Sequence, residues 1–119
     1  MSANHAQIRG SSVGMDVLRN GFLSGDNATI ASPTYAGFQV YTGGVVSAND
    51  AVVTGGTNYS YLSTTGGFMQ VDRASANSGP FCYYANYGGW ISATAATAAG
   101  CAAPQFTPAT GSDPRWITH

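Results

Sequence analysis

Paired glycines divide the middle of this chain into short segments of similar length. The pairs are Gly43-Gly44, Gly55-Gly56, Gly66-Gly67 and Gly88-Gly89, and the last interval is twice as long as the one before it. A further turn sequence, Asn77-Ser78-Gly79, falls within this longest interval. Glycine reaches positive φ without a Cβ clash, which tight two-residue turns require. A chain interrupted this often is expected to form short strands rather than long helices.

The segments between the glycines have the composition and the alternation of β-strands. They are rich in Val, Tyr, Phe and Thr, and in 35–41 the side chains of Phe38 and Val40 fall on one face. The same alternation recurs in 58–64, 67–73 and 81–87. Short β-forming runs with frequent turn signals predict an antiparallel all-β fold, a meander, sandwich or small barrel of about 6–8 short strands.

The two ends of the chain are expected to be less regular than its middle. Residues 1–27 predict an extended N-terminal arm with a short helix at 13–20, either packed on its own domain or reaching over a neighbour. Residues 28–103 contain the β segments, including an Ala-rich tract at 93–101 that fits a short helix or a strand. Residues 104–119 contain three prolines and predict an irregular tail.

The charge content is unusually low and narrows the classes of function. Charged residues make up 8% of the chain, against about 25% in an average domain. The sequence has no Lys and no Glu, and its formal net charge is −1. Four scattered arginines are too few to bind a nucleic-acid backbone well. Because so neutral a surface lacks the repulsion that keeps proteins apart, we expect a subunit that binds its own copies and another structural protein.

The sequence shows neither a membrane span nor a signal peptide. No stretch reaches the ~18 apolar residues of a membrane helix. Residues 1–5 lack the basic and apolar regions of a secretion signal, which predicts synthesis in the cytoplasm.

Two cysteines leave two interpretations open. A bridge between Cys82 and Cys101 would close a loop worth about 3 kcal/mol of unfolded-state entropy and would indicate an oxidising location. Alternatively, both are buried thiols that pack as small apolar groups. The chain lacks Cys-x-x-Cys and His-x-His spacings, so we predict no metal site, and no other motif indicates a cofactor.

One motif superficially suggests catalysis. Residues 10–14 match the G-x-S-x-G nucleophile elbow with Ser12 at its centre, and Asp113 and His119 follow in the appropriate order. The elbow requires a buried strand of a large α/β sheet, whereas Ser12 follows a polar segment in a short chain. The aspartates are scattered, and Asp72 beside Arg73 is expected to form an outward salt link or an inter-subunit contact. We therefore predict that the protein is not an enzyme.

Aromatic residues interleaved with Asn, Ser, Thr and Gly are the candidate interface. They are Tyr35, Tyr41, Tyr59, Tyr61, Tyr84, Tyr87, Trp90 and Trp116, and Tyr83 shares the same setting. Tyrosine contributes contact area at little entropic cost together with a hydroxyl group, which suits protein interfaces and also stacking on sugar rings. A third interpretation places most of these rings in the core of the sheet.

Two resemblances accompany these observations. The small, charge-poor, Gly/Thr/Ala-rich β chain with its polar start resembles phage head decoration proteins in character, which implies a location in the virion. The loop bracketed by Cys82 and Cys101 resembles the disulfide loop of type IV pilin head domains, although the long apolar helix of pilins is absent. We expect a non-enzymatic virion subunit, of the head decoration or minor capsid kind; the alternatives are an extracellular fimbrial or pilin-type subunit and a small glycan-binding module.

Overall fold

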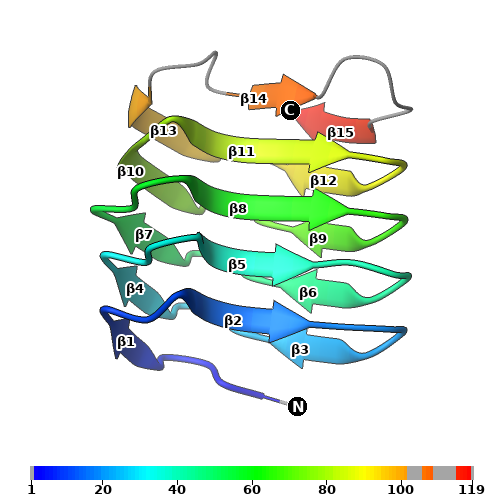
Figure 1. Cartoon of the computed structure of the whole chain (residues 1–119), viewed down its shortest axis with the longest axis horizontal. Coiled ribbons are helices and arrows are strands. Elements are labelled where there is room, and N and C mark those ends of the chain that lie inside the picture. Colours follow the sequence, from blue (N-terminus) through cyan, green and yellow to red (C-terminus); the bar gives the residue numbers. More distant parts are fainter. Residues whose placement is uncertain (1, 102–105, 109–114, 119) are drawn as a thin grey trace.

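The chain winds through a series of short strands as a regular coil (Figure 1). The computed structural model describes residues 2–101, 106–108 and 115–118. The first coil contains β1 (Gln7–Arg9), β2 (Val13–Val17) and β3 (Phe22–Ser24). The second contains β4 (Thr29–Ala31), β5 (Ala36–Val40) and β6 (Val45–Ser47).

The later coils repeat this pattern. The third contains β7 (Val52–Thr54), β8 (Tyr59–Thr64) and β9 (Phe68–Gln70), and the fourth contains β10 (Ser75–Gly79), β11 (Phe81–Asn86) and β12 (Trp90–Ala93). A fifth set consists of β13 (Thr97–Cys101), β14 (Phe106–Pro108) and β15 (Arg115–Thr118).

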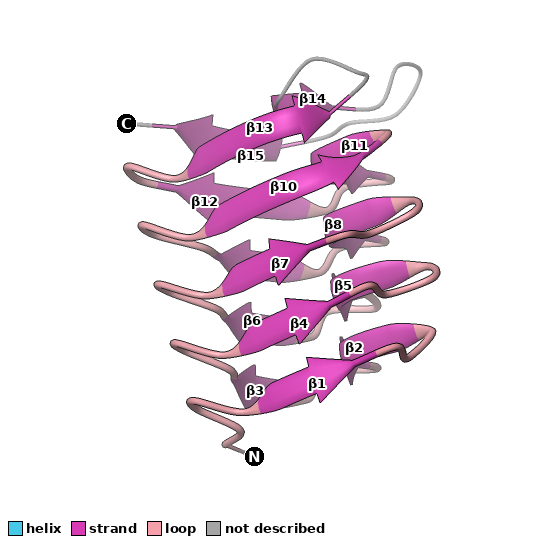
Figure 2. Ribbon diagram, turned by 90° about the vertical axis from the view of Figure 1, so that its left-hand side faces the viewer, coloured by secondary structure: helices cyan, strands magenta, loops and turns pink. Residues whose placement is uncertain are grey.

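Equivalent strands of successive coils pair in parallel and form three five-stranded sheets (Figure 2). Their orders are β1-β4-β7-β10-β13, β2-β5-β8-β11-β14 and β3-β6-β9-β12-β15. Leu23 lies beside Val46, Val46 beside Met69 and Met69 beside Ile91, so the sequence advances by a nearly constant step from one coil to the next at this position. Sheets built from stacked repeats in this way define a β-solenoid. The predicted antiparallel meander, sandwich or small barrel is therefore wrong.

The glycine pairs form corners of the coil rather than hairpin turns. Asn20-Gly21, Gly43-Gly44, Gly66-Gly67 and Gly88-Gly89 occupy one corner in successive coils, and we call it the glycine corner. Gly43, Gly66 and Gly88 have φ of 75°, 76° and 77°, where glycine is favoured. Gly55-Gly56 lies at a different corner, between β7 and β8. The repeat is therefore one full coil, and glycine pairs from two of its corners alternate along the sequence. This alternation produces the short spacing that is also typical of hairpins.

The ends of the described chain are more regular than the sequence indicated. Residues 7–24, within the expected arm, form the first coil, and the expected helix at 13–20 is replaced by strand β2 and the corner after it. The Ala-rich tract contributes to β12 and β13 and forms no helix. In the expected tail, β14 and β15 are strands, and the remaining positions lie outside the described residues.

The core consists of rows of side chains that run along the solenoid. In the third sheet, one inward row contains Leu23, Val46, Met69 and Ile91, all buried. In the second sheet, Phe38, Tyr61 and Tyr83 stack with ring centroids 5.4 and 4.9 Å apart and planes 4° from parallel. Stacking is expected because parallel pairing places equivalent side chains about 4.8 Å apart on the same face.

Two tyrosines belong to this core because their hydroxyl groups have partners there. The Tyr61 hydroxyl lies 3.1 Å from the carbonyl oxygen of Ala51 and 3.0 Å from that of Ser75. The Tyr83 hydroxyl is placed in the same way toward Ala74 and Thr97. Burial raises the pKa of both groups, so each remains protonated and can donate.

A disulfide joins the fourth coil to the next strand of the first sheet. Cys82 in β11 and Cys101 in β13 are bonded, with Cα atoms 5.9 Å apart, as usual for such bonds. The bridged interpretation of the two cysteines is therefore the one that the structure supports.

Replacing Tyr61 by Phe should lower the free energy of unfolding by about 1–2 kcal/mol, because the buried hydrogen bond that its one hydroxyl proton donates, shared between the carbonyl oxygens of Ala51 and Ser75, is lost. Urea denaturation followed by circular dichroism measures the change. Tyr35→Phe is the control, since its ring is 41% exposed, and it should change stability by less than about 0.5 kcal/mol. Equal losses in the two variants would contradict the placement of the Tyr61 hydroxyl.

Replacing both cysteines by Ala should lower the free energy of unfolding by about 3 kcal/mol through the freed loop. Amide hydrogen exchange should accelerate most in β13 and least in β4, which lies far from the bond. Alkylation of the wild-type protein, denatured but not reduced, should leave its mass unchanged; labelling of both thiols would refute the bridge.

Candidate functional site

Four aromatic side chains gather on the outside of the second sheet. We call Tyr35, Tyr59, Phe81 and Tyr84 the aromatic cluster. The rings of Tyr59 and Phe81 stack at 5.2 Å, and Tyr84 lies 5.2 Å from Tyr59 and 4.8 Å from Phe81. Tyr35 meets Tyr59 edge-on at 5.6 Å. The cluster thus spans three successive coils at the start of β5, β8 and β11.

Parallel register explains why these residues meet. Phe81 is the direct register partner of Tyr59 in the next coil, and Tyr35 immediately precedes Ala36, the partner of Tyr59 in the coil before. Tyr35 is 41% exposed, whereas the other three rings are half-buried. Burial raises the pKa of Tyr59, with smaller contributions from Tyr35 and Tyr84, so its hydroxyl stays protonated at neutral pH.

The structure brings together some of the candidate interface residues but not all of them. Tyr35, Tyr59 and Tyr84 lie in the aromatic cluster, whereas Tyr61 is fully buried and takes no part in a surface. Tyr41 and Tyr87 lie elsewhere, at the glycine corner.

The two tryptophans lie apart from the cluster. Trp90 begins β12 in the third sheet and is half-buried. Trp116 lies in β15 beside Ile91 in the register, and its side chain lies outside what the structure describes.

Sequence reasoning missed Phe81 as a member of this surface. Phe81 follows Tyr59 by one full coil, and the recurrence of an aromatic residue at that interval was the available signal. The signal is readable only once the repeat length is known.

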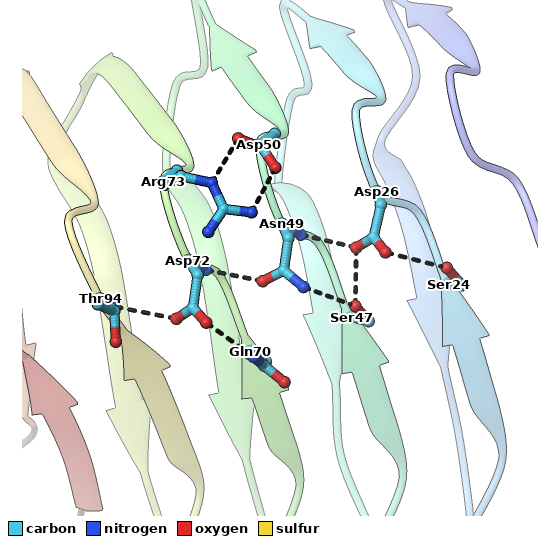
Figure 3. Close-up of polar contacts among 9 residues, drawn as sticks. All are labelled: Ser24, Asp26, Ser47, Asn49, Asp50, Gln70, Asp72, Arg73 and Thr94. Carbon is cyan, nitrogen blue, oxygen red and sulfur yellow. Dashed lines mark hydrogen bonds and ion pairs between the residues drawn. The ribbon is translucent and has the colours of Figure 1, made fainter.

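A polar ladder follows the corner between the third and first sheets (Figure 3). At each step a side-chain oxygen accepts the backbone N–H of the equivalent residue in the next coil, at 2.8–3.0 Å. The ladder contains Asn4, Asp26, Asn49, Asp72 and Thr94. Amide and carboxylate residues alternate, so the two carboxylates are two coils, roughly 10 Å, apart.

The ladder aspartates are engaged in structure. Asp26 also accepts from Ser47 at 2.7 Å, and Asp72 accepts from Gln70 at 2.7 Å. Burial acts to raise the pKa of Asp72, but hydrogen bonds from Gln70 and Thr94 outweigh it and lower the pKa overall.

The outward salt link expected at Arg73 is formed with a different aspartate. Arg73 pairs in bidentate fashion with Asp50 at 2.9 and 2.7 Å, and Asp72 accepts hydrogen bonds in the ladder instead. The hydrogen bond from Arg73 lowers the pKa of Asp50. An exposed pair of this kind contributes little to stability.

The described residues include only one of the three residues that the nucleophile-elbow motif would require. Ser12 lies in the corner between β1 and β2, and Asp113 and His119 lie outside the described residues. Among the positions that the structure describes, no three His, Cys, Asp or Glu residues gather as metal ligands. The described part of the chain also contains no helix with the length and apolar character needed to cross a membrane.

Comparisons with protein-family models, curated proteins and solved structures give no significant match. The functional argument therefore depends on the geometry of this chain alone.

Replacing Asp72 by Asn should weaken the acid sensitivity of the fold. The folded-state pKa of Asp72 is lowered, so its stabilising contribution is present above the unfolded pKa of about 4 and is lost as the pH falls through the folded value. Urea denaturation between pH 7 and pH 2 should show a smaller loss for this variant than for wild type.

Asp16→Asn serves as a control of opposite sign. Burial raises the pKa of Asp16, more than the hydrogen bond involving the Val17 backbone lowers it, so ionising this group costs stability as the pH rises. Its replacement should increase stability at pH 7. If the Asp72→Asn variant lost as much stability between pH 7 and pH 2 as wild type does, the role assigned to Asp72 in the ladder would be contradicted.

Proposed function

We propose that the protein is a non-enzymatic structural subunit, a rigid β-solenoid that acts by binding other protein surfaces. The observation that carries this proposal is the aromatic cluster. Tyr35, Tyr59, Phe81 and Tyr84 lie outside the core and pack ring against ring, which fixes them before any partner arrives. Pre-ordered tyrosines are effective interface anchors, because little side-chain entropy is lost on binding.

The charge distribution supports the same function. The chain carries few charged groups, and Asp26, Asp72 and Asp50 are committed to the corner ladder and the salt bridge. A neutral, tyrosine-rich surface loses little solvation energy when another protein covers it. Binding to its own copies and to a shell of a second structural protein fits these features, and the virion is the location that we propose.

The disulfide favours a second candidate, an extracellular surface subunit. A bond between Cys82 and Cys101 persists in oxidising surroundings, such as a cell surface or the outside of a virion. Both candidates therefore place the mature protein outside a reducing cytoplasm and share the same contact chemistry.

The ring geometry favours a protein partner over a glycan. Stacking on a sugar requires an open ring face, but Tyr59 and Phe81 lie 5.2 Å apart with planes 19° from parallel and so cover one face of each other. The cluster therefore offers other molecules mainly ring edges and hydroxyl groups, which suit the mixed contacts of a protein interface.

Immunoelectron microscopy of native material tests this function. An antibody against the chain should label assembled particles or surface filaments, and purified protein should rebind to particles from which it was stripped. Tyr59→Ser with Tyr84→Ser should weaken rebinding at least tenfold, since two anchor residues are lost.

Val52→Ser with Thr54→Ser is the matched control on the first sheet and should bind like wild type. Label confined to soluble fractions, or equal binding by the cluster variant, would refute the proposal. Binding on a glycan array, together with no antibody label on particles and no rebinding to them, would favour the glycan-binding alternative.

A further inference from the structure

An apolar row runs along the outside of the third sheet, separate from the aromatic cluster. It consists of the first residues of β3, β6, β9 and β12, namely Phe22, Val45, Phe68 and Trp90, which are direct register partners. Beyond Trp90 the register continues to Arg115, the first residue of β15. These strands, β3, β6, β9 and β12, lie one above another in Figure 1. Phe22 is 56% exposed, and Phe68 and Trp90 contact each other with ring centroids 6.4 Å apart. The row therefore rises by about 4.8 Å per coil over four coils.

The glycine corner borders this row and carries one charge. In each coil one residue comes just before the turn of the glycine corner. These residues are Arg19, Thr42, Thr65 and Tyr87, and their similar φ values of 51°, 54°, 52° and 46° show that the positions are equivalent. Arg19 is the only charged residue in the sequence segments 18–21, 41–44, 64–67 and 87–89. Tyr87, at the other end, is 69% exposed.

We propose that the apolar row is the contact surface for a second copy of this chain, which lies alongside the first in antiparallel orientation about a two-fold axis. This proposal rests on the structural function proposed above and adds the partner and the arrangement. A second copy is the partner whose row has the same spacing, so every step of one row meets a step of the other. The four residues of the row carry no charge, and the next register position, Arg115, lies beyond Trp90 at one end only. An antiparallel second copy therefore meets the row without repulsion and keeps the two Arg115 positions at opposite ends of the pair.

The order of side chains along the row selects the antiparallel orientation. Reversal places Phe22 opposite Trp90 and Val45 opposite Phe68, so the small residue meets a large one at the centre. A parallel arrangement instead places Trp90 against Trp90 and Val45 against Val45, which leaves bulky and hollow levels. Two-fold pairing is also the commonest symmetry of soluble homo-oligomers.

The charge at the glycine corner selects the same orientation. In the antiparallel pair Arg19 lies opposite the exposed ring of Tyr87 in the second copy, where a cation–π contact is favourable. A parallel two-fold pair reverses the strand direction in the second copy, so the two glycine corners would lie at opposite edges and this contact would be lost. The antiparallel pair keeps the corners on one edge and separates the two Arg19 side chains by three coils, about 14 Å.

The aromatic cluster does not offer this repeated contact. Its rings come from non-equivalent positions, since Tyr35 precedes its strand and Tyr84 lies further along β11 than Phe81, the first residue of that strand. It therefore remains available to a different partner while the row is covered by the second copy.

Sedimentation velocity of the purified full chain over a range of concentrations tests the pairing. Wild type should shift from monomer to dimer with a dissociation constant in the micromolar range, as expected for a small interface. Phe68→Arg places a charge at the centre of the row and should raise this constant at least about tenfold.

Val52→Arg is the matched control, because Val52 begins β7 of the same coil, is half-buried and lies on the first sheet. It should dimerise like wild type. Circular dichroism and thermal melting confirm that both variants are folded. A wild-type chain that stays monomeric at all concentrations, or equal weakening by both variants, overturns the proposal.

Cross-linking determines the orientation. When Arg19→Cys and Tyr87→Cys chains are mixed and oxidised, the antiparallel pair gives a disulfide between the two different chains, identified by peptide mass. In a parallel two-fold pair the strands run in opposite directions across the contact, so the two glycine corners lie at opposite edges and this mixed disulfide cannot form. The antiparallel pair in turn cannot join two Arg19→Cys chains across about 14 Å. Dimers that lack the mixed disulfide overturn the proposal. Absence of dimers with intact particle rebinding would refute this inference and leave the proposed function standing.

Discussion

Parallel backbone hydrogen bonding between successive coils is the interaction on which the rest of this structure depends. Each coil serves as the template for the next, so equivalent residues of neighbouring coils are placed on the same face at the same level. This constraint produces the stacked rings of Phe38, Tyr61 and Tyr83 in the core and the polar ladder at the corner. It also explains the alternation of Asn and Asp, because two adjacent carboxylates at one ladder position would repel each other.

The same constraint arranges the outer surface. A side chain that points outward in one coil is repeated by its register partner in the next, so the surface consists of rows rather than scattered residues. Where the row is aromatic, the rings support one another and form pre-ordered contact surfaces. In the function that we propose, a chain this poor in charge obtains defined binding surfaces from register, and the aromatic cluster and the apolar row are two separate examples.

The sequence indicated several of the strands in the middle of the chain but not their number, which was predicted as about 6–8, nor their parallel pairing. Alternation is a local property, so the runs around Phe38 and Met69 were recognised as strands. Pairing partners are a non-local property, and Gly55-Gly56 lies between two glycine corners and imitates the spacing of hairpins. The first coil was missed because its one comparable signal is Asn20-Gly21, and the apolar spacing in 13–20 was interpreted as a short helix. For the site, three tyrosines of the cluster were identified, but Phe81 required the repeat length.

Nuclear Overhauser effects between side chains of the third sheet test the central claim most directly. A parallel solenoid predicts contacts from Leu23 to Val46, from Val46 to Met69 and from Met69 to Ile91, each joining equivalent positions of neighbouring coils. Cross-strand contacts between Gln39 and Ala48 around Gly43-Gly44, in place of that series, would indicate a hairpin and contradict the account.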